Sequence, residues 1–193
     1  MEQTYAIELK NITKRFGKIV ANDGINLKVK RGEILSLLGE NGSGKTTLMN
    51  MISGIYFPDE GRILVDGKAV SIRSPKDSFD LGIGMIHQHF KLIDVMTAAE
   101  NIILGLKGNA VLDMKKVHKD IQELVDRYGF DLDPAQKVYT MSVSQKQTVE
   151  IVKMLYRGAN ILILDEPTAV LTPQEVDKLF EVLRNMRDDG RAI

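Results

Sequence analysis

The stretch Gly39-Glu40-Asn41-Gly42-Ser43-Gly44-Lys45-Thr46 decides the fold of this chain. It fits the pattern G-x-x-x-x-G-K-[ST] at every fixed position. The apolar run at residues 34–38 before it predicts a short buried strand. Leu48, Met51 and Ile52 after it recur at helical spacing and predict a helix. A glycine loop between a strand and a helix indicates a phosphate-binding P-loop, whereas a glycine-rich turn with a surface lysine would leave the flanking pattern to coincidence.

The residue types in this loop suit an anionic ligand. Glycines let the backbone N–H groups curl closely round a phosphate, and the following helix points its N-terminal partial positive charge at it. Lys45 adds a full charge for the outer phosphates, and the Thr46 hydroxyl is a hard oxygen ligand suited to Mg²⁺. The predicted nucleotide contacts are Gly39, Glu40, Asn41, Gly42, Ser43, Gly44, Lys45, Thr46 and Thr47.

Composition narrows the class of protein. The 193 residues suffice for one domain with its own core. The 26 basic and 26 acidic residues cancel, so the charge gives no argument for a nucleic-acid partner. Cysteine is absent, which fits a cytoplasmic protein, and no apolar run approaches the roughly 18 residues that span a bilayer. The start of the sequence lacks the parts of a signal peptide, so we expect any membrane role to come through a partner.

The first part of the chain reads as antiparallel strands. Alternating runs at residues 5–10 and 25–30 predict two half-buried strands. The run at residues 62–68 resembles one arm of a hairpin with an Asp66-Gly67 turn. Residues 83–88 then predict a buried strand that ends in polar residues.

The second part reads as helical, with one return to a buried strand. From about residue 97 to 156 the pattern is helical, and one apolar stripe is stopped by Gly129. Residues 161–164 predict a buried parallel strand. In the last helix Thr172 fits an N-cap, Pro173 the first position and Glu175 the capping box. We expect its apolar face to contain Val176, Leu179, Phe180 and Leu183, and the stripe before it Val117, Ile121, Leu124, Val125 and Tyr128.

A pair of acids follows the strand at residues 161–164. Acidic residues at the end of a parallel strand face the crevice where ligands bind in open α/β sheets. Asp165 fits the role of holding Mg²⁺, and Glu166 is placed to deprotonate the attacking water. Two solvated acids before a turn at Pro167 are the alternative. The pair, with no Asn-Lys-x-Asp sequence present, argues against a small GTPase.

At this point the chain resembles the nucleotide-binding subunit of ATP-binding cassette (ABC) transporters. The specific pieces are residues 20–23, the loop at 39–46, residues 84–90 and residues 164–175. The resemblance runs from about residue 5 to 193, and it is nearest to bacterial nucleoside and simple-sugar importers of the basic-membrane-lipoprotein type. It implies an α/β P-loop NTPase fold with a RecA-like parallel core, an antiparallel β subdomain and a helical subdomain at about residues 90–156.

The resemblance also implies roles that chemistry alone leaves open. Phe16 falls where the family stacks an aromatic ring on adenine, with an ordinary loop or core phenylalanine as the alternative. Gln88 falls on the glutamine that reaches Mg²⁺ or the attacking water, with a plain polar strand end as the alternative. The implied metal ligands are thus Thr46, Gln88 and Asp165. We interpret His87 and His89 as loop residues, since no third metal ligand is evident.

The stretch Ser142-Val143-Ser144-Gln145 sits where the family carries its Leu-Ser-Gly-Gly-Gln signature. In the family this loop caps the γ-phosphate of the ATP bound by the opposite cassette. Ser142 and Gln145 also fit a capping box, so a capped helix without a ligand is the alternative. Val143 and Ser144 replace the two glycines, and Thr148 replaces a common arginine. A side chain at Ser144 hinders close backbone approach, which puts the activity of the site this loop completes in doubt.

Further departures concern the end of the chain. Thr172 stands where many members have an aspartate, and its capping role explains the threonine. The family's switch histidine follows the last helix, beyond Ile193, and many members carry two cassettes in tandem. We therefore expect an N-terminal fragment of a longer protein, a C-terminally truncated cassette that turns ATP over slowly by itself.

The leading hypothesis is a motor ATPase that binds ATP and Mg²⁺ and powers solute import. Its implied partners are a second cassette, the membrane permease and, indirectly, an extracellular substrate-binding lipoprotein. It would then lie at the cytoplasmic face of the membrane, with Glu166 and Gln88 as the catalytic residues. One alternative is a regulatory cassette that binds nucleotide but hydrolyses little, which Ser144 motivates. Another is a soluble cassette in translation or DNA repair, which the neutral charge argues against.

Overall fold

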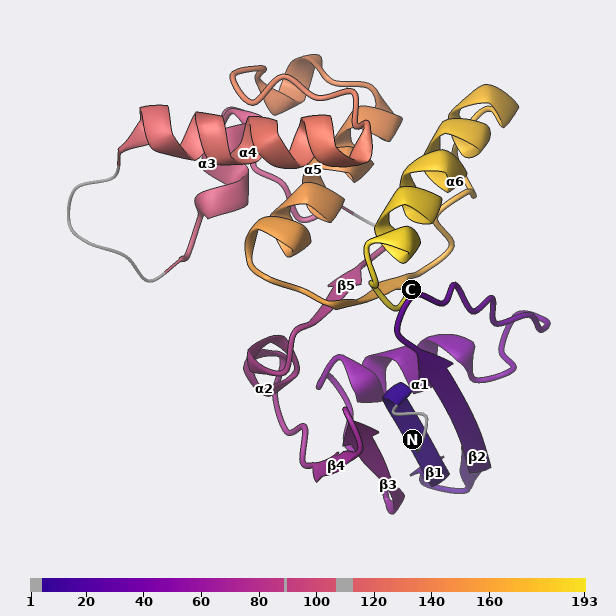
Figure 1. The fold of residues 1–193 in the computed structure, drawn as a ribbon. Helices are drawn as coiled ribbons and strands as arrows, with labels where there is room; N and C mark the ends of the chain where they lie inside the picture. Colours follow the sequence, from indigo (N-terminus) through magenta and orange to yellow (C-terminus); the bar gives the residue numbers. More distant parts are fainter. Residues whose placement is uncertain (1–4, 89, 107–112) are drawn as a thin grey trace. The chain divides into compact units, whose positions relative to one another are not determined.

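The computed structural model describes residues 5–88, 90–106 and 113–193, and the chain forms two compact units (Figure 1). The first unit combines Met1–Met85 with Asn160–Asp165 and Met186–Ile193. The second combines Ile86–Ala159 with Glu166–Asn185. The chain passes from the first unit to the second directly between Asp165 and Glu166.

An antiparallel sheet of four strands dominates the first unit. The strands are β1 (Tyr5–Phe16), β2 (Ile19–Lys30), β3 (Glu60–Val65) and β4 (Lys68–Val70), in the order β2-β1-β3-β4. The two predicted strands and the Asp66-Gly67 hairpin are confirmed, and β1 and β2 are longer than their alternating cores. Asp66 and Gly67 have φ 48° and 77°, the left-handed conformation that a two-residue hairpin turn requires.

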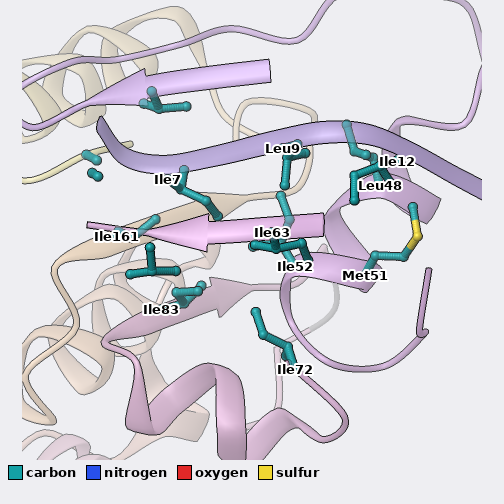
Figure 2. Close-up of a cluster of buried hydrophobic side chains, with 14 residues drawn as sticks. Ile7, Leu9, Ile12, Leu48, Met51, Ile52, Ile63, Ile72, Ile83 and Ile161 are labelled. Carbon is teal, nitrogen blue, oxygen red and sulfur yellow. The ribbon is translucent and has the colours of Figure 1, made fainter. Parts of the chain in front are cut away.

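The core of the first unit lies between this sheet and helix α1 (Lys45–Ile52), which the sequence predicted (Figure 2). Leu48, Met51 and Ile52 on one face of α1 are all buried, as their spacing requires. The side chains that Figure 2 labels in this cluster are Ile7, Leu9, Ile12, Leu48, Met51, Ile52, Ile63, Ile72, Ile83 and Ile161. The helix that follows the phosphate loop is therefore anchored by its apolar face.

The prediction of a buried strand at residues 34–38 is wrong. This run forms no strand, its residues are half-buried or exposed, and Leu38 is 92% exposed. The Leu35 N–H donates to the Ile193 carbonyl at 2.8 Å, and the Ile193 N–H donates to the Glu33 carbonyl at 2.9 Å. A β-strand needs a neighbouring segment that hydrogen-bonds to it along its whole length. These bonds reach only the start of the run, so the rest is extended without being a strand.

Two short strands lead to the predicted site residues. β5 (Ile83–Ile86) and β6 (Ile161–Leu164) form a two-stranded sheet, and β6 is joined to Ala192 by a parallel bridge at Ile161. β5 is buried throughout, as predicted, whereas the second half of β6 is half-buried. Helix α2 (Pro75–Asp80) precedes β5 and is capped by Ser74. Gln88 and Asp165 follow the ends of β5 and β6 in sequence.

The second unit is helical. It contains α3 (Ala98–Ile103), α4 (Met114–Tyr128), the short 3-10 helix η1 (Val138–Thr140), α5 (Val143–Tyr156) and most of α6 (Pro173–Asp188). The predicted stripe on α4 is confirmed, with Leu124 half-buried and the other four residues buried. Gly129 ends α4 with φ 77°. In the described ranges, no helix has both the length and the apolar character to cross a membrane.

The last helix begins as predicted but buries a different part of its apolar face. The Glu175 N–H donates to the Thr172 hydroxyl at 3.4 Å and the Thr172 N–H donates to the Glu175 carboxylate at 2.9 Å, which completes the capping box. Val182 and Leu183 are buried, whereas Leu179 is half-buried and Phe180 is 36% exposed. Leu179 lines a cavity instead of contacting a fully packed core, which accounts for its partial exposure.

Candidate nucleotide-binding site

The phosphate loop presents an open helix N-terminus. Gly42 and Gly44 have φ 83° and 89°, the left-handed conformation that glycine adopts freely. Helix α1 begins at Lys45 with no side-chain cap and with no acidic residue in its first turn. Its first N–H groups are therefore not satisfied by a capping side chain, and the positive end of its dipole is not neutralised by a first-turn acid. Such a terminus binds anions.

Gly44 is required for a second reason. A Cβ at this position would lie 2.2 Å from the Ala21 carbonyl oxygen, so no side chain fits. The Asn22 side chain also stabilises the backbone at this position, because its Nδ2 donates to the Gly44 carbonyl at 3.3 Å. Within the described ranges, Asn22 Oδ1 is buried without a hydrogen-bond partner. Sequence reasoning gave Asn22 no role, although it lies in the conspicuous stretch at residues 20–23.

Lys45 lies back across the start of the loop. Its Nζ donates to the Gly39 carbonyl at 2.7 Å and to the Glu40 carbonyl at 2.8 Å. A Cβ on Gly39 would lie 2.7 Å from the Ser43 hydroxyl oxygen, so the loop is compact here as well. The ammonium is thus held beside the loop by two neutral oxygens. A phosphate would offer it charged oxygens instead, and hydrogen bonds between charged groups are shorter and stronger.

The two predicted catalytic residues are brought together in the second unit. Gln88 Nε2 donates to Glu166 Oε2 at 3.4 Å, although 78 residues separate them in the sequence. Both side chains are exposed, so water reaches the carboxylate. Glu166 also has φ 49°, a left-handed conformation that costs an L-residue about 1–2 kcal/mol. Non-glycine residues held in this region concentrate at functional sites.

The predicted metal ligands are hard oxygen donors of the kind that Mg²⁺ takes. They are the Thr46 hydroxyl and Asp165 in the first unit and the Gln88 amide in the second. Asp165 is half-buried directly after β6, and Thr46 is exposed in the first turn of α1. In the described part of the chain no group of three or more His, Asp or Glu side chains could hold an ion. The Mg²⁺ role of these three residues stays a prediction.

The other residues expected at this site lie as follows. Phe16 ends β1 and is 42% exposed, with its ring centroid 5.1 Å from that of Tyr56 in an edge-on contact. Its ring remains partly accessible for stacking, and the adenine role stays a prediction. His87 is half-buried after β5, and His89 lies outside the described residues.

The predicted signature stretch forms the N-terminus of α5. The Gln145 N–H donates to the Ser142 hydroxyl at 3.2 Å and the Ser142 N–H donates to the Gln145 side-chain oxygen at 3.1 Å, so the predicted capping box is confirmed. Val143 is 44% exposed. Ser144 does not face open solvent, because its hydroxyl donates to Glu175 at 2.6 Å. This link was missed because Glu175 already had a role in the cap of α6.

A cavity of about 210 Å³ lies next to this link, inside the second unit. Its wall combines the apolar side chains of Ile151, Leu179 and Val182 with the polar groups of Ser144 and Glu175. Another hydrogen bond ties α5 to the segment before α6, because Gln147 Nε2 donates to the Pro167 carbonyl at 3.0 Å. The stretch that follows Glu166 is therefore fixed to the signature helix.

Comparison with known proteins places this site in context. The family model described as ABC transporter matches residues 22–169. The guanosine import ATP-binding protein of Bacillus subtilis (strain 168) is 52% identical over 98% of this chain and 38% of its own length. The ribose import ATP-binding protein 1 of Streptomyces avermitilis is 46% identical over 97% of this chain and 36% of its own. The chain therefore spans little more than a third of these relatives.

A solved structure has the same fold. The dimeric post-hydrolysis state of an ATP-binding cassette bound to ADP and Pi shares 29% sequence identity with this chain. It superposes with a TM-score of 0.78 over 96% of this chain and 84% of the cassette. The mixed α/β architecture with antiparallel and helical parts is thus that of a P-loop ATPase cassette, as the sequence predicted.

Proposed function

The chain belongs to the ABC transporter family, and on this premise we propose that it is an ATPase cassette that powers the import of a nucleoside or simple sugar through a membrane permease. The observation that carries the proposal is the phosphate loop. There an uncapped helix N-terminus follows a left-handed glycine, and the Lys45 ammonium is held by two neutral carbonyls that a phosphate can replace.

ATP binding in this proposal rests on backbone N–H groups and one charge. The loop at residues 39–44 and the first turn of α1 bind the phosphates, and Lys45 moves from the carbonyls of Gly39 and Glu40 to the outer phosphate oxygens. Phe16 stacks on the adenine ring, which its 42% exposure permits. Binding therefore depends on residues of the first unit.

Hydrolysis in this proposal uses the carboxylate of Glu166. It accepts a proton from the water that attacks the γ-phosphorus, while the bond from that phosphorus to the β–γ bridging oxygen breaks. The hydrogen bond from Gln88 orients this carboxylate. Thr46, Gln88 and Asp165 would hold Mg²⁺, which when bound would supply positive charge to stabilise the phosphates.

The proposed partners follow from the relatives. A related cassette is a dimer in a post-hydrolysis state, which supports a second cassette whose ATP is capped by the Ser142 loop. Import requires a membrane permease, and we infer that the chain lies at the cytoplasmic face of the membrane with an extracellular lipoprotein as an indirect partner. Relatives named for guanosine and ribose import support a nucleoside or a simple sugar as the solute.

A second candidate function is a regulatory cassette that binds nucleotide and hydrolyses little. The observation that favours it is the engagement of Ser144 by Glu175 at 2.6 Å. A serine occupies the place of a signature glycine, and its hydroxyl is already used within the chain. The two candidates differ in turnover and agree in binding.

The experiment measures ATP turnover in lipid by the complete protein that carries this chain, together with its permease. We expect turnover to rise when the solute-loaded receptor is added. Two variants locate the activity: Lys45→Ala lowers ATP affinity, and Glu166→Gln keeps the affinity but abolishes turnover at the site that this chain supplies.

The matched control is Lys119→Ala, an exposed lysine of α4 that pairs with Glu123 at 3.8 Å. It should leave affinity and turnover unchanged. Tight ATP binding without receptor stimulation would favour the regulatory cassette. If Lys45→Ala binds ATP as tightly as the parent protein does, the proposed nucleotide site is wrong.

A further inference from the structure

Two serines at the N-terminus of α5 and Glu175 in the first turn of α6 form one chain of hydrogen bonds. The hydroxyl oxygens of Ser142 and Ser144 lie 2.9 Å apart. The Ser144 hydroxyl donates to Glu175 Oε1 at 2.6 Å. The second carboxylate oxygen of Glu175 accepts from the N–H and the hydroxyl of Thr172, at 2.9 and 3.0 Å. The carboxylate is therefore fixed by α6 and touches the signature loop through Ser144.

The chemistry of the carboxylate fixes the direction of this chain. The Ser144 hydroxyl holds the pKa of the Glu175 carboxyl below its ordinary value, with further contributions from Thr172. The group is ionised near neutral pH and can only accept hydrogen bonds. Ser144 has one proton and uses it on Glu175, so between the two serines Ser144 must accept. The single proton of Ser142 therefore points toward Ser144, into its own chain.

The negative charge of Glu175 also opposes phosphate binding at the N-terminus of α5. The N-terminus of α5 carries the partial positive charge that would attract a phosphate. The Glu175 carboxylate lies one hydroxyl away from the first turn of α5 and takes part of that favourable interaction. Glu175 thus puts a negative charge, supplied by the chain itself, near the helix N-terminus that an anionic ligand would approach.

We propose that Glu175 is a positioning residue for the signature loop. Through Ser144 it turns the Ser142 hydroxyl proton away from the γ-phosphate of an ATP molecule, so the carboxylate competes with that phosphate for the proton. The inference rests on the proposed function, in which this loop caps the ATP of a second cassette. In this inference, the Ser144 hydroxyl and the Glu175 charge weaken the binding of ATP by the signature loop. Crowding by the Ser144 Cβ is not the sole cause.

The test compares KM and kcat for ATP in the complete protein with its permease. Ser144→Ala keeps the Cβ and removes the hydroxyl, so the Ser142 proton is released. We expect KM to fall by about tenfold, the effect of one hydrogen bond to a charged group, with kcat within about twofold. Ser144→Thr keeps a hydroxyl and should retain the parent KM. Glu175→Gln, which preserves the cap of α6, should also lower KM.

Two controls match these variants. Thr148→Val removes a hydroxyl of α5 that donates to the Ser144 carbonyl at 3.1 Å. Glu100→Gln changes the equivalent position of the capping box of α3. Both should leave KM unchanged. In a Ser142→Ala background, Ser144→Ala should change KM by less than about twofold, because no Ser142 proton remains to be released.

The outcomes separate this inference from the proposed function. An unchanged or raised KM in Ser144→Ala, while Lys45→Ala weakens ATP binding, overturns the positioning role and leaves the ATPase intact. Binding that Lys45→Ala does not affect overturns both. An NMR titration checks the link itself, since the pKa of Glu175 should rise toward its ordinary value in Ser144→Ala and should not move in Thr148→Val.

Discussion

At the scale of single residues, two glycines of one loop have different reasons to be glycine. Gly42 and Gly44 are both left-handed, with φ 83° and 89°. At Gly42 an added Cβ would have no atom within 4 Å, whereas at Gly44 it would lie 2.2 Å from the Ala21 carbonyl oxygen. Backbone preference alone constrains the first position, and both preference and close approach constrain the second.

This difference gives a prediction. Gly42→Ala should lower the free energy of unfolding by about 1 kcal/mol, the cost of a left-handed L-residue. Gly44→Ala should lower it by about 2–4 kcal/mol, because the loop must also move away from Ala21, and it should weaken ATP binding. Urea unfolding and binding of a fluorescent ATP analogue measure the two quantities. Equal losses in the two variants would contradict the close-approach argument.

Glu166 is held in a conformation that costs stability. It has φ 49° and a hydrogen bond from Gln88. Glu166 is both a strained residue and the candidate catalytic base. We infer that the fold loses some stability to hold this carboxylate in its position.

Glu166→Gly tests that idea. It should raise the free energy of unfolding by about 1 kcal/mol, because glycine adopts the left-handed conformation freely, and it should abolish turnover at this site. Glu166→Gln removes the charge but keeps the backbone requirement, so it should abolish turnover with unchanged stability. Chemical denaturation of the two variants and the parent protein measures these free energies of unfolding. A destabilised Glu166→Gly would show that the carboxylate stabilises the fold more than its backbone strains it.

At the scale of elements, the pairing of β1 with β2 places an acid between two lysines. Glu8 on β1 is opposite Lys28 on β2, and its carboxylate lies 3.0 Å from the ammonium groups of both Lys28 and Lys10. Hydrogen bonds from Lys28, which has the larger effect, and from Lys10 hold the pKa of the Glu8 carboxyl below its ordinary value. The carboxylate is therefore favoured more in the folded chain than in the unfolded one.

The sign of the resulting pH dependence follows from this shift. A depressed pKa in the folded state gives stability that is complete above the unfolded pKa and is lost as the pH falls through the folded pKa. Glu8→Gln should therefore lose part of the acid-induced decrease in Tm between about pH 5 and pH 3. Thermal unfolding across this range measures it. Glu123→Gln on the exposed face of α4 is the control and should keep the parent pH profile.

At the scale of the whole molecule, the residues proposed for ATP binding and hydrolysis are divided between the two units. The phosphate loop and Asp165 belong to the first unit, and Gln88, Glu166 and the signature stretch belong to the second. The peptide bond between Asp165 and Glu166 joins the two units at the carboxylate pair. Formal charges of +26 and −26 cancel over the chain, so a net field gives no argument for a charged ligand.

Most elements could be predicted because their signals are local. The alternation of β1, the stripe of α4 and the cap of α6 depend on neighbours within one strand or helix. The run at residues 34–38 could not be predicted in this way. An apolar run becomes a strand only when another segment hydrogen-bonds along it. Here the backbone hydrogen bonds with Ile193 involve Glu33 and Leu35, at the start of the run.

The sequence by itself determined the phosphate loop, the helix behind it, the acidic pair and the family, because glycine freedom, helical spacing and charge are properties of adjacent residues. Only the tertiary structure decided which distant side chains meet. Gln88 reaches Glu166 across 78 positions and Ser144 reaches Glu175 across 31. Hydrogen bonds of this kind depend on the packing of separate elements, so no local pattern records them, and they determine where the protons of the signature loop point.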